Sequence, residues 1–159
     1  MTEECYRAKL WLSRTFNIMS KLEAENRTLL VLKSKLGSGV RNYDSIGIKN
    51  DVESSIRRRE DLLIEFSLQS ERIEKTQKLY FKELDKTRSV IEKLSAPILQ
   101  AIATDRYINN LKWKELEKNY YYGTSELFVF HTQILNEVYE ILVSELIVTD
   151  EPIHQNIGA

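Results

Sequence analysis

A narrow apolar stripe from Val52 to Leu94, uninterrupted by glycine or proline, is the feature that most constrains this chain. Its positions are alternately four and three residues apart, and nine of the 13 are apolar. A stripe this long and narrow is typical of a coiled-coil seam, whereas a globular helix has a wider apolar face. The positions are Val52, Ile56, Arg59, Leu63, Phe66, Ser70, Ile73, Gln77, Tyr80, Leu84, Thr87, Ile91 and Leu94.

The N-terminal residues 2–36 also lack glycine and proline, and they predict a second long helix. Apolar or small residues fall on a similar grid, which Thr15, Asn26 and Lys33 interrupt. Asn26 is either a solvated position or a polar residue that fixes the register against a partner helix. The grid positions are Cys5, Ala8, Leu12, Met19, Leu22, Leu29 and Leu36.

Residues 37–50 separate the two helices and contain most of the turn-forming residues of this half. Gly37-Ser38-Gly39 is interpreted as a helix stop, because a phosphate loop needs a following Lys-Ser/Thr and a preceding strand. A short loop between two apolar seams predicts an antiparallel helical hairpin over residues 1–94. Pairing of the same seams between two copies is the competing arrangement, so either a monomer or a homodimer is expected.

Shorter helices are predicted in residues 95–148, before a loose tail at 149–159. Ser95 is expected to cap the first of them, with Pro97 in its first turn. Two short helices, a tight turn at Tyr120-Tyr121-Tyr122-Gly123 and a third helix match a helix-turn-helix plan. The chain is therefore predicted to be all-α. The three helices are expected at Ile98–Asn109, Trp113–Asn119 and Thr124–Val148. One or more of the three tyrosines is expected to pack between helices while another is exposed.

The net charge of −1 hides a strong asymmetry between the two ends of the chain. All 23 Lys and Arg lie at or before Lys118, and residues 119–159 carry six carboxylates and no basic residue. The first 118 residues therefore sum to 23 − 18 = +5 and the last 41 to −6. No apolar run reaches membrane-spanning length, the N-terminus is acidic, and Cys5 is the one cysteine, so a buried or unreactive thiol and a cytoplasmic location are expected.

No catalytic constellation is evident in the sequence. His131 has no Cys, His or paired carboxylate near it at metal-ligand spacing, so we expect no enzyme activity, no metal and no cofactor. The one basic run, Arg57-Arg58-Arg59, is either a solvated helix face or a contact for phosphate or an acidic protein.

Three segments resemble a known group of proteins. Asp105-Arg106-Tyr107-Ile108, then Lys112-Trp113-Lys114-Glu115-Leu116, then His131 with Ile134-Leu135 after the tyrosine turn are similar to the sigma-factor-region-4-like domain of RinA/ArpU-type regulators. Phages and mobile elements of Gram-positive bacteria carry these proteins. The resemblance covers most of residues 20–145 and implies a helix-turn-helix whose third helix enters the DNA major groove.

Two departures from that pattern bear on function. Glu117 stands where such domains have a small residue that lets two helices pack closely. The residues that lead the third helix, 124–131, include no Lys or Arg, although basic side chains dominate both phosphate and guanine contacts. The domain is therefore expected to keep its scaffold while its DNA-reading surface is replaced.

The favoured interpretation is a mobile-element protein, not an enzyme, that binds and modulates or inhibits a basic host protein that handles nucleic acid, for example a CRISPR nuclease or RNA polymerase. One alternative is a DNA-binding transcription activator, and the other is a structural coiled-coil adaptor. Phe128 is the expected exposed anchor, since Phe128 and Phe130 cannot face the same side of one helix. The expected partner contacts are Glu126, Phe128, Glu137, Glu140 and Tyr121. The activator would use Arg57, Arg58, Arg59, Lys112, Lys114 and Lys118.

Overall fold

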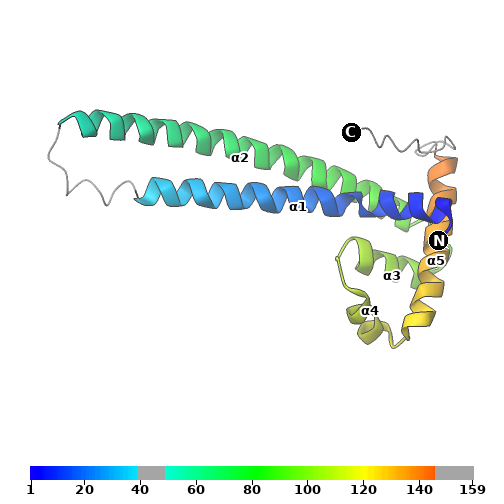
Figure 1. Cartoon of the computed structure of the whole chain (residues 1–159). Helices are drawn as coiled ribbons and strands as arrows, with labels where there is room; N and C mark the ends of the chain where they lie inside the picture. The colour runs from blue at the N-terminus through cyan, green and yellow to red at the C-terminus, as the bar shows by residue number, and fades with distance from the viewer. Residues whose placement is uncertain (39–48, 146–159) are drawn as a thin grey trace, which may run out of the picture. The chain divides into compact units, whose positions relative to one another are not determined.

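The computed structural model describes residues 1–38 and 49–145, which fold into helices with no strand among them. The prediction of an all-α chain is confirmed. Figure 1 labels the five helices of the described ranges. They are α1 (Glu3–Ser38), α2 (Lys49–Ile91), α3 (Pro97–Tyr107), α4 (Trp113–Tyr120) and α5 (Thr124–Ser144). Most of the 37–50 loop and the 149–159 tail lie outside the described residues.

The connection between α2 and α3 differs in detail from the prediction. The cap of α3 is Ala96, in extended conformation, and Pro97 occupies the first helical turn, where its missing N–H costs no hydrogen bond. Ser95 was the wrong choice of cap, because its hydroxyl and its backbone N–H both donate to Glu137 on α5. The chain leaves α2 in a tightened turn in which the N–H of Leu94 bonds the carbonyl oxygen of Ile91 at 3.1 Å.

The described residues divide into two compact units. Unit 1 combines Met1–Phe16 with the residues from Glu83 onward, and unit 2 is Asn17–Lys82. Both α1 and α2 contribute to each unit. The boundary expected at residue 94 therefore lies inside unit 1, whose core includes Ala8 and Leu12 of α1.

In unit 2 the two helix segments run side by side and meet around Glu25 (Figure 1). Its carboxylate accepts hydrogen bonds from the Thr76 hydroxyl at 3.0 and 2.9 Å, and its backbone oxygen accepts one from Gln69 Nε2 at 2.9 Å. These three residues replace purely apolar packing at this point. Leu32 and Ile73 are the buried apolar residues of unit 2.

The buried stripe of α2 is offset by one residue from the predicted heptad seam in unit 2. Gln69 and Thr76 are buried where Ser70 and Gln77 were expected, although Ile73 keeps its predicted place. Successive residues of a helix point about 100° apart, so a shift of one residue brings a neighbouring strip of the helix surface into contact with the other helix. Nearer the start of α2 the predicted seam is not buried within the chain. Val52, Ile56 and Leu63 are 42%, 45% and 50% exposed.

The same shift affects α1. Asn26 is exposed and Glu25 takes the inward polar position, while Leu32 is buried in place of Lys33. A carboxylate withdrawn from water needs hydrogen-bond donors, and Thr76 and Gln69 supply them to the side chain and backbone of Glu25. The register-fixing role considered for Asn26 is therefore filled by its neighbour.

Unit 1 packs the beginning of α1 and the end of α2 against α3, α4 and α5. Its buried apolar residues include members of all five helices, with Leu12, Ile91, Ile102, Leu116 and Ile134 each 2% exposed or less. The sequence from α3 to α5 thus buries its apolar face against residues that come from the distant first turns of α1.

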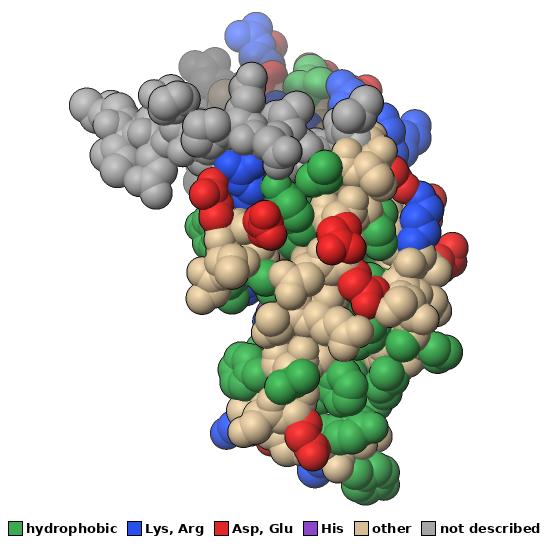
Figure 2. All heavy atoms as spheres, turned by 90° about the vertical axis from the view of Figure 1, so that its right-hand side faces the viewer, with side chains coloured by type: hydrophobic (Ala, Val, Ile, Leu, Met, Phe, Trp, Pro, Cys, Tyr) green, Lys and Arg blue, Asp and Glu red, His purple; other side chains and the backbone are tan. Residues whose placement is uncertain are grey.

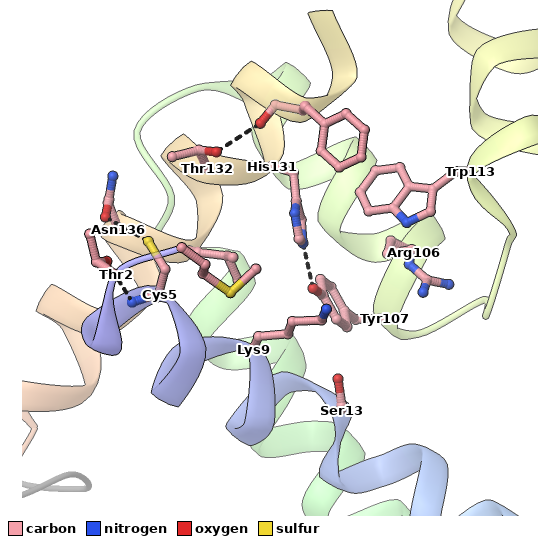
Figure 3. A pocket seen from close by; sticks show the side chains of 13 residues that line it. Thr2, Cys5, Lys9, Ser13, Arg106, Tyr107, Trp113, His131, Thr132 and Asn136 are labelled. Atoms are coloured by element: carbon pink, nitrogen blue, oxygen red, sulfur yellow. Dashed lines mark hydrogen bonds between the residues drawn. The ribbon is translucent and has the colours of Figure 1, made fainter. Parts of the chain in front are cut away.

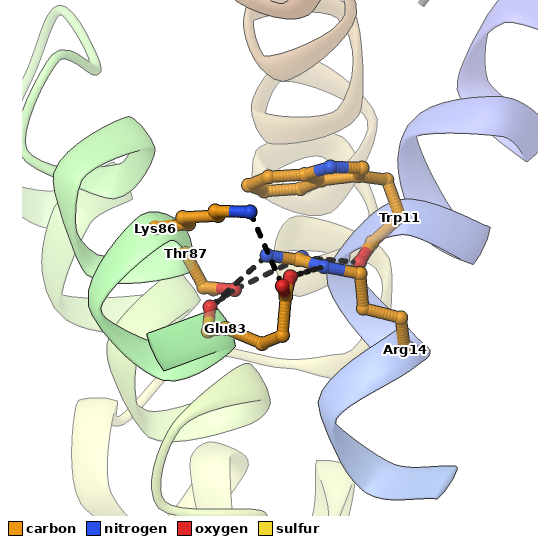
Figure 4. A network of polar contacts seen from close by, with 5 residues as sticks. All are labelled: Trp11, Arg14, Glu83, Lys86 and Thr87. Atoms are coloured by element: carbon orange, nitrogen blue, oxygen red, sulfur yellow. Dashed lines mark hydrogen bonds and ion pairs between the residues drawn. The ribbon is translucent and has the colours of Figure 1, made fainter. Parts of the chain in front are cut away.

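A polar network joins α1 to α2 inside unit 1 (Figure 4). Arg14 donates from Nε to the Glu83 carboxylate at 2.9 Å, and from Nη1 to the Thr87 hydroxyl at 3.0 Å. The guanidinium lies 3.7 Å from the centroid of the Trp11 ring, and its Nη1 also bonds the Trp11 carbonyl oxygen. Planar stacking and several donors together fix this arginine in one geometry.

Candidate functional site

The turn between α4 and α5 directs one tyrosine into solvent. Tyr120 donates its hydroxyl to Asp105 at 2.6 Å, and the Tyr122 ring lies 5.1 Å from that of Phe130. Tyr121 has φ 57° and ψ 30°, a left-handed conformation that few residues other than glycine adopt, and it is 94% exposed. The prediction that the tyrosines divide between packing and exposure is confirmed.

Glu126, an expected partner contact, is exposed and also stabilises the start of α5. Its carboxylate accepts a hydrogen bond of 3.3 Å from the N–H of Gly123, the reciprocal half of a capping box. Thr124 in the same turn donates its hydroxyl to Glu117. Glu117 therefore joins α4 to the start of α5 at the position where the resemblance leads one to expect a small residue.

Phe128 and Val129 are neighbouring apolar residues on α5 that are 55% and 67% exposed. The Phe128 ring stacks on Trp113 with 5.9 Å between centroids, whereas Phe130 turns toward Tyr122. The two phenylalanines thus face different sides, as expected. These two residues form part of the lining of a shallow depression of about 410 Å³. The full lining is Phe128, Val129, Thr132, Gln133 and Asn136. We call these five residues the α5 outer face.

Hydrophobic and acidic side chains occupy separate parts of the surface over α5. Figure 2 shows hydrophobic side chains gathered in the lower half of this view and most of the carboxylates above them. Glu140 is exposed, and Glu145 pairs with Lys93. A surface with an apolar part and an acidic part is a suitable contact for a partner that carries both apolar and basic groups.

Glu137 has an internal role that the sequence did not indicate. Its carboxylate accepts the Ser95 hydroxyl at 2.6 Å, the Ser95 N–H at 2.9 Å and Gln133 Nε2 at 3.2 Å. Burial would raise the pKa of Glu137, but these hydrogen bonds outweigh it and hold the pKa below its usual value. Glu137 therefore ties α5 to the α2–α3 connection.

The candidate basic residues lie in two separate units. Arg57, Arg58 and Arg59 are exposed on α2 in unit 2. Lys112, Lys114 and Lys118 are exposed at α4 in unit 1, and the backbone N–H of Lys112 donates to the Glu115 carboxylate at 2.7 Å.

A pocket of about 450 Å³ opens in unit 1 and was not foreseen from the sequence (Figure 3). Trp113, Phe128 and Tyr107 supply aromatic groups to its lining, and Lys9 and Arg106 supply positive charge. Arg106, Tyr107 and Trp113 belong to the segments that carry the family resemblance. Lys9 belongs to α1, and it reaches this pocket through the packing of unit 1, which no local sequence pattern could predict.

His131 lies in the pocket wall and is only 6% exposed. Its Nε2 is 2.6 Å from the Tyr107 hydroxyl, and its ring makes a T-shaped contact with the Trp113 ring, with 4.8 Å between centroids. Burial, followed by the nearby charges of Lys9 and Arg106, lowers the pKa of His131 to about 4. The imidazole is therefore neutral at pH 7.

Metal ligation and thiol chemistry find no support in the described part of the chain. No cluster of three or more His, Cys, Asp or Glu there could hold a metal ion. Cys5 is buried, as expected, and its thiol donates to the Asn136 side-chain oxygen at 3.0 Å. None of the helices described is long and apolar enough to cross a membrane.

Comparison with protein-family models, with curated proteins and with solved structures finds no match for this chain.

Proposed function

We propose that this chain is a binding protein without enzymatic activity, and that the α5 outer face contacts a basic protein partner. The observation that carries the proposal is Phe128, a large aromatic side chain that is 55% exposed and held in place by stacking on Trp113. Exposed aromatic anchors dominate the energy of many protein interfaces, and a rigid anchor loses little conformational entropy when it binds.

The charge distribution supports a basic partner. Glu126 and Glu140 are exposed on α5, and the chain has no Lys or Arg after Lys118. Complementary charge raises the association rate and disfavours partners of the same sign. DNA carries the opposite of the required charge, so the leading turns of α5 are a poor DNA-reading surface.

We further propose the finer architecture expected from the sequence. Antiparallel pairing of α1 with α2 is supported in unit 2 by Glu25 against Gln69 and Thr76. Within unit 1 the supporting pair is Arg14 and Glu83. A helix-turn-helix-like unit is supported by the short α4, the three-residue turn to α5 and the contacts of both helices with α3.

The resemblance to RinA/ArpU-type regulators supplies the biological setting of the proposal. In that setting the chain would come from a phage or mobile element and act in the host cytosol. A basic, nucleic-acid-handling host protein, such as a CRISPR nuclease or RNA polymerase, is the class of partner that fits an acidic and aromatic contact surface.

Capture of host proteins by the full chain, after nuclease treatment of the lysate, tests the proposal first. Surface plasmon resonance with the captured partner then compares Phe128→Ala with Phe81→Ala. Phe81 is a matched control, because it is a phenylalanine of similar exposure (60%) on α2 in unit 2. We expect Phe128→Ala to raise the dissociation rate about tenfold or more and Phe81→Ala to leave it unchanged. Loss of binding in Phe81→Ala alone would move the contact surface to α2.

The second candidate function is the DNA-binding activator, which the exposed Lys112, Lys114 and Lys118 favour. Duplex binding by the full chain should be measured over a series of salt concentrations. We expect no tight complex at physiological salt. A tight complex whose affinity falls steeply with salt, and which is lost when the three lysines become glutamines, would replace our proposal with the activator.

The third candidate is the structural adaptor, which exposed apolar residues on α2 favour. Leu63, Ile64 and Leu68 are 50%, 59% and 45% exposed in unit 2. Such a surface would bind a further helix, either from a second copy or from another protein. Sedimentation velocity at micromolar concentration distinguishes a homodimer from a monomer, and a homodimer would favour the adaptor.

A further inference from the structure

The charged side chains that line the pocket in unit 1 are all positive. Among its 13 lining residues are two cations, Lys9 and Arg106, and no Asp or Glu. Its volume of about 450 Å³ lies within the range of small-molecule sites, which is roughly 300–1,000 Å³. The lining comes from α1, α3, α4 and α5, so it is formed only when unit 1 has folded.

Neither cation is neutralised within the described residues. Lys9 has no carboxylate at ion-pair distance there, and Arg106 donates from Nη1 to the carbonyl oxygen of Leu111 at 3.0 Å, a bond that leaves its charge uncompensated. Both lie close enough to His131 to disfavour its protonated form. Two uncompensated cations beside one cavity attract an anion of the size that the cavity admits.

Aromatic side chains line the same pocket. Trp113 and Phe128 stack on each other, and the Arg106 guanidinium lies 5.2 Å from the Trp113 ring centroid. In Figure 3, Lys9 extends toward Tyr107 and His131, and Arg106 lies beside Trp113. Flat π faces favour a planar ring as ligand. The neutral His131 and its partner Tyr107 add a polar, uncharged patch to the lining.

We propose that this pocket binds a small organic anion with a planar aromatic ring, whose carboxylate or phosphate lies at Lys9 and Arg106 and whose ring lies against Trp113. The ligand-binding role is distinct from the protein-binding role proposed above, although Phe128, Thr132 and Asn136 line both the pocket and the α5 outer face. Lys9 and Arg106 belong to the pocket alone.

The probes are 2-naphthoate, which has both ring and carboxylate, 2-naphthylmethanol, which lacks the charge, and cyclohexanecarboxylate, which lacks the aromatic ring. Binding to the full chain is followed by calorimetry and by shifts of the Trp113 indole N–H in ¹H–¹⁵N spectra. We expect 2-naphthoate to bind about tenfold or more tightly than the other two. Adenosine monophosphate against adenosine repeats the comparison for a phosphate, and the tighter of the two anions identifies the source of the charge.

Lys9→Gln is the decisive variant, since Lys9 is exposed and its loss leaves the core intact. We expect it to weaken the tighter anion about five- to tenfold and to leave the uncharged analogue unchanged. Lys114→Gln, an exposed lysine of the same unit that does not line the pocket, is the matched control. The proposal is overturned if neither anion binds with a millimolar or lower Kd, or if Lys9→Gln and Lys114→Gln affect binding equally.

Discussion

The hydroxyl oxygen of Tyr107 and Nε2 of His131 lie 2.6 Å apart, on side chains that are 2% and 6% exposed. Burial raises the pKa of the Tyr107 hydroxyl to about 12, so the phenol keeps its proton. The pKa of His131 is about 4 because of burial and the charges of Lys9 and Arg106. The pair is therefore uncharged at neutral pH. Protonation of the imidazole would place a positive charge on a buried side chain next to Lys9 and Arg106.

This pair predicts a loss of stability in mild acid. Above pH 6.5 His131 is neutral in both the folded and the unfolded chain, so it contributes no pH dependence. Below pH 6.5 the unfolded chain binds a proton that the folded chain does not bind until about pH 4. The free energy of unfolding should therefore fall by about 2 kcal/mol from this group between pH 7.5 and pH 5. Urea denaturation at the two values measures it.

A matched pair of variants separates His131 from other titrating groups. His131→Gln should remove this part of the pH dependence, whatever it does to stability at pH 7.5. His154→Gln changes the other histidine of the chain and should retain the full dependence. Equal pH dependence in the two variants would show that His131 does not titrate as its surroundings imply.

Burial in unit 2 predicts unequal effects of two substitutions that the heptad pattern treats alike. Ile73 is 8% exposed and Leu63 is 50% exposed. Ile73→Asp should lower the free energy of unfolding by several kcal/mol, because an unpaired charge would lie in an apolar contact. Leu63→Asp should change it by about 0.5 kcal/mol or less. Thermal denaturation of both variants checks the difference, and a comparable loss in Leu63→Asp would restore the predicted seam.

The Glu25–Thr76 contact should be measurable as a coupling energy between α1 and α2. Removing the Thr76 hydroxyl leaves the Glu25 carboxylate with Lys21 at 3.8 Å, and removing the carboxylate leaves the hydroxyl without this acceptor. A double-mutant cycle of Glu25→Ala and Thr76→Val should give a coupling of about 1 kcal/mol. The same cycle with Glu23→Ala, an exposed glutamate on α1, should give none. Additive effects in the Glu25 cycle would contradict the contact.

The sequence predicted the helices well and their contact edges less well, for a physical reason that Glu25 illustrates. Glycine and proline positions determine where helices can end, and periodicity gives their faces only to within a residue or so. The apolar grid placed Asn26 and Lys33 in the seam. The structure instead turns the partly buried Glu25 toward α2, where its hydrogen bonds with Thr76 and Gln69 offset the loss of water contacts. Such polar pairing depends on both helices at once.

The placement of the α5 residues proposed as a contact surface was partly predictable, and the pocket was not. The spacing of Phe128 and Phe130 requires that they face different sides, which the structure bears out. Lys9 and Arg106 are far apart in the sequence and meet at one cavity only through the fold of unit 1. Glu137 could not be recognised as structural either, because its partner Ser95 lies on the connection that precedes α3.

Glu137 and Glu140 provide the last prediction, since both are acidic residues of α5 but only Glu137 has hydrogen-bond partners among the described residues. Glu137→Lys removes the acceptor of the Ser95 hydroxyl and N–H and should lower the free energy of unfolding by about 1–3 kcal/mol. Glu140→Lys changes an exposed side chain and should leave stability within about 0.5 kcal/mol of the original.

Against the basic partner proposed above, Glu140→Lys should lower the association rate and weaken its dependence on salt. Urea denaturation with surface plasmon resonance separates the two roles. An unchanged stability in Glu137→Lys would mean that the Ser95 contact contributes nothing, and would return Glu137 to the group of candidate partner contacts.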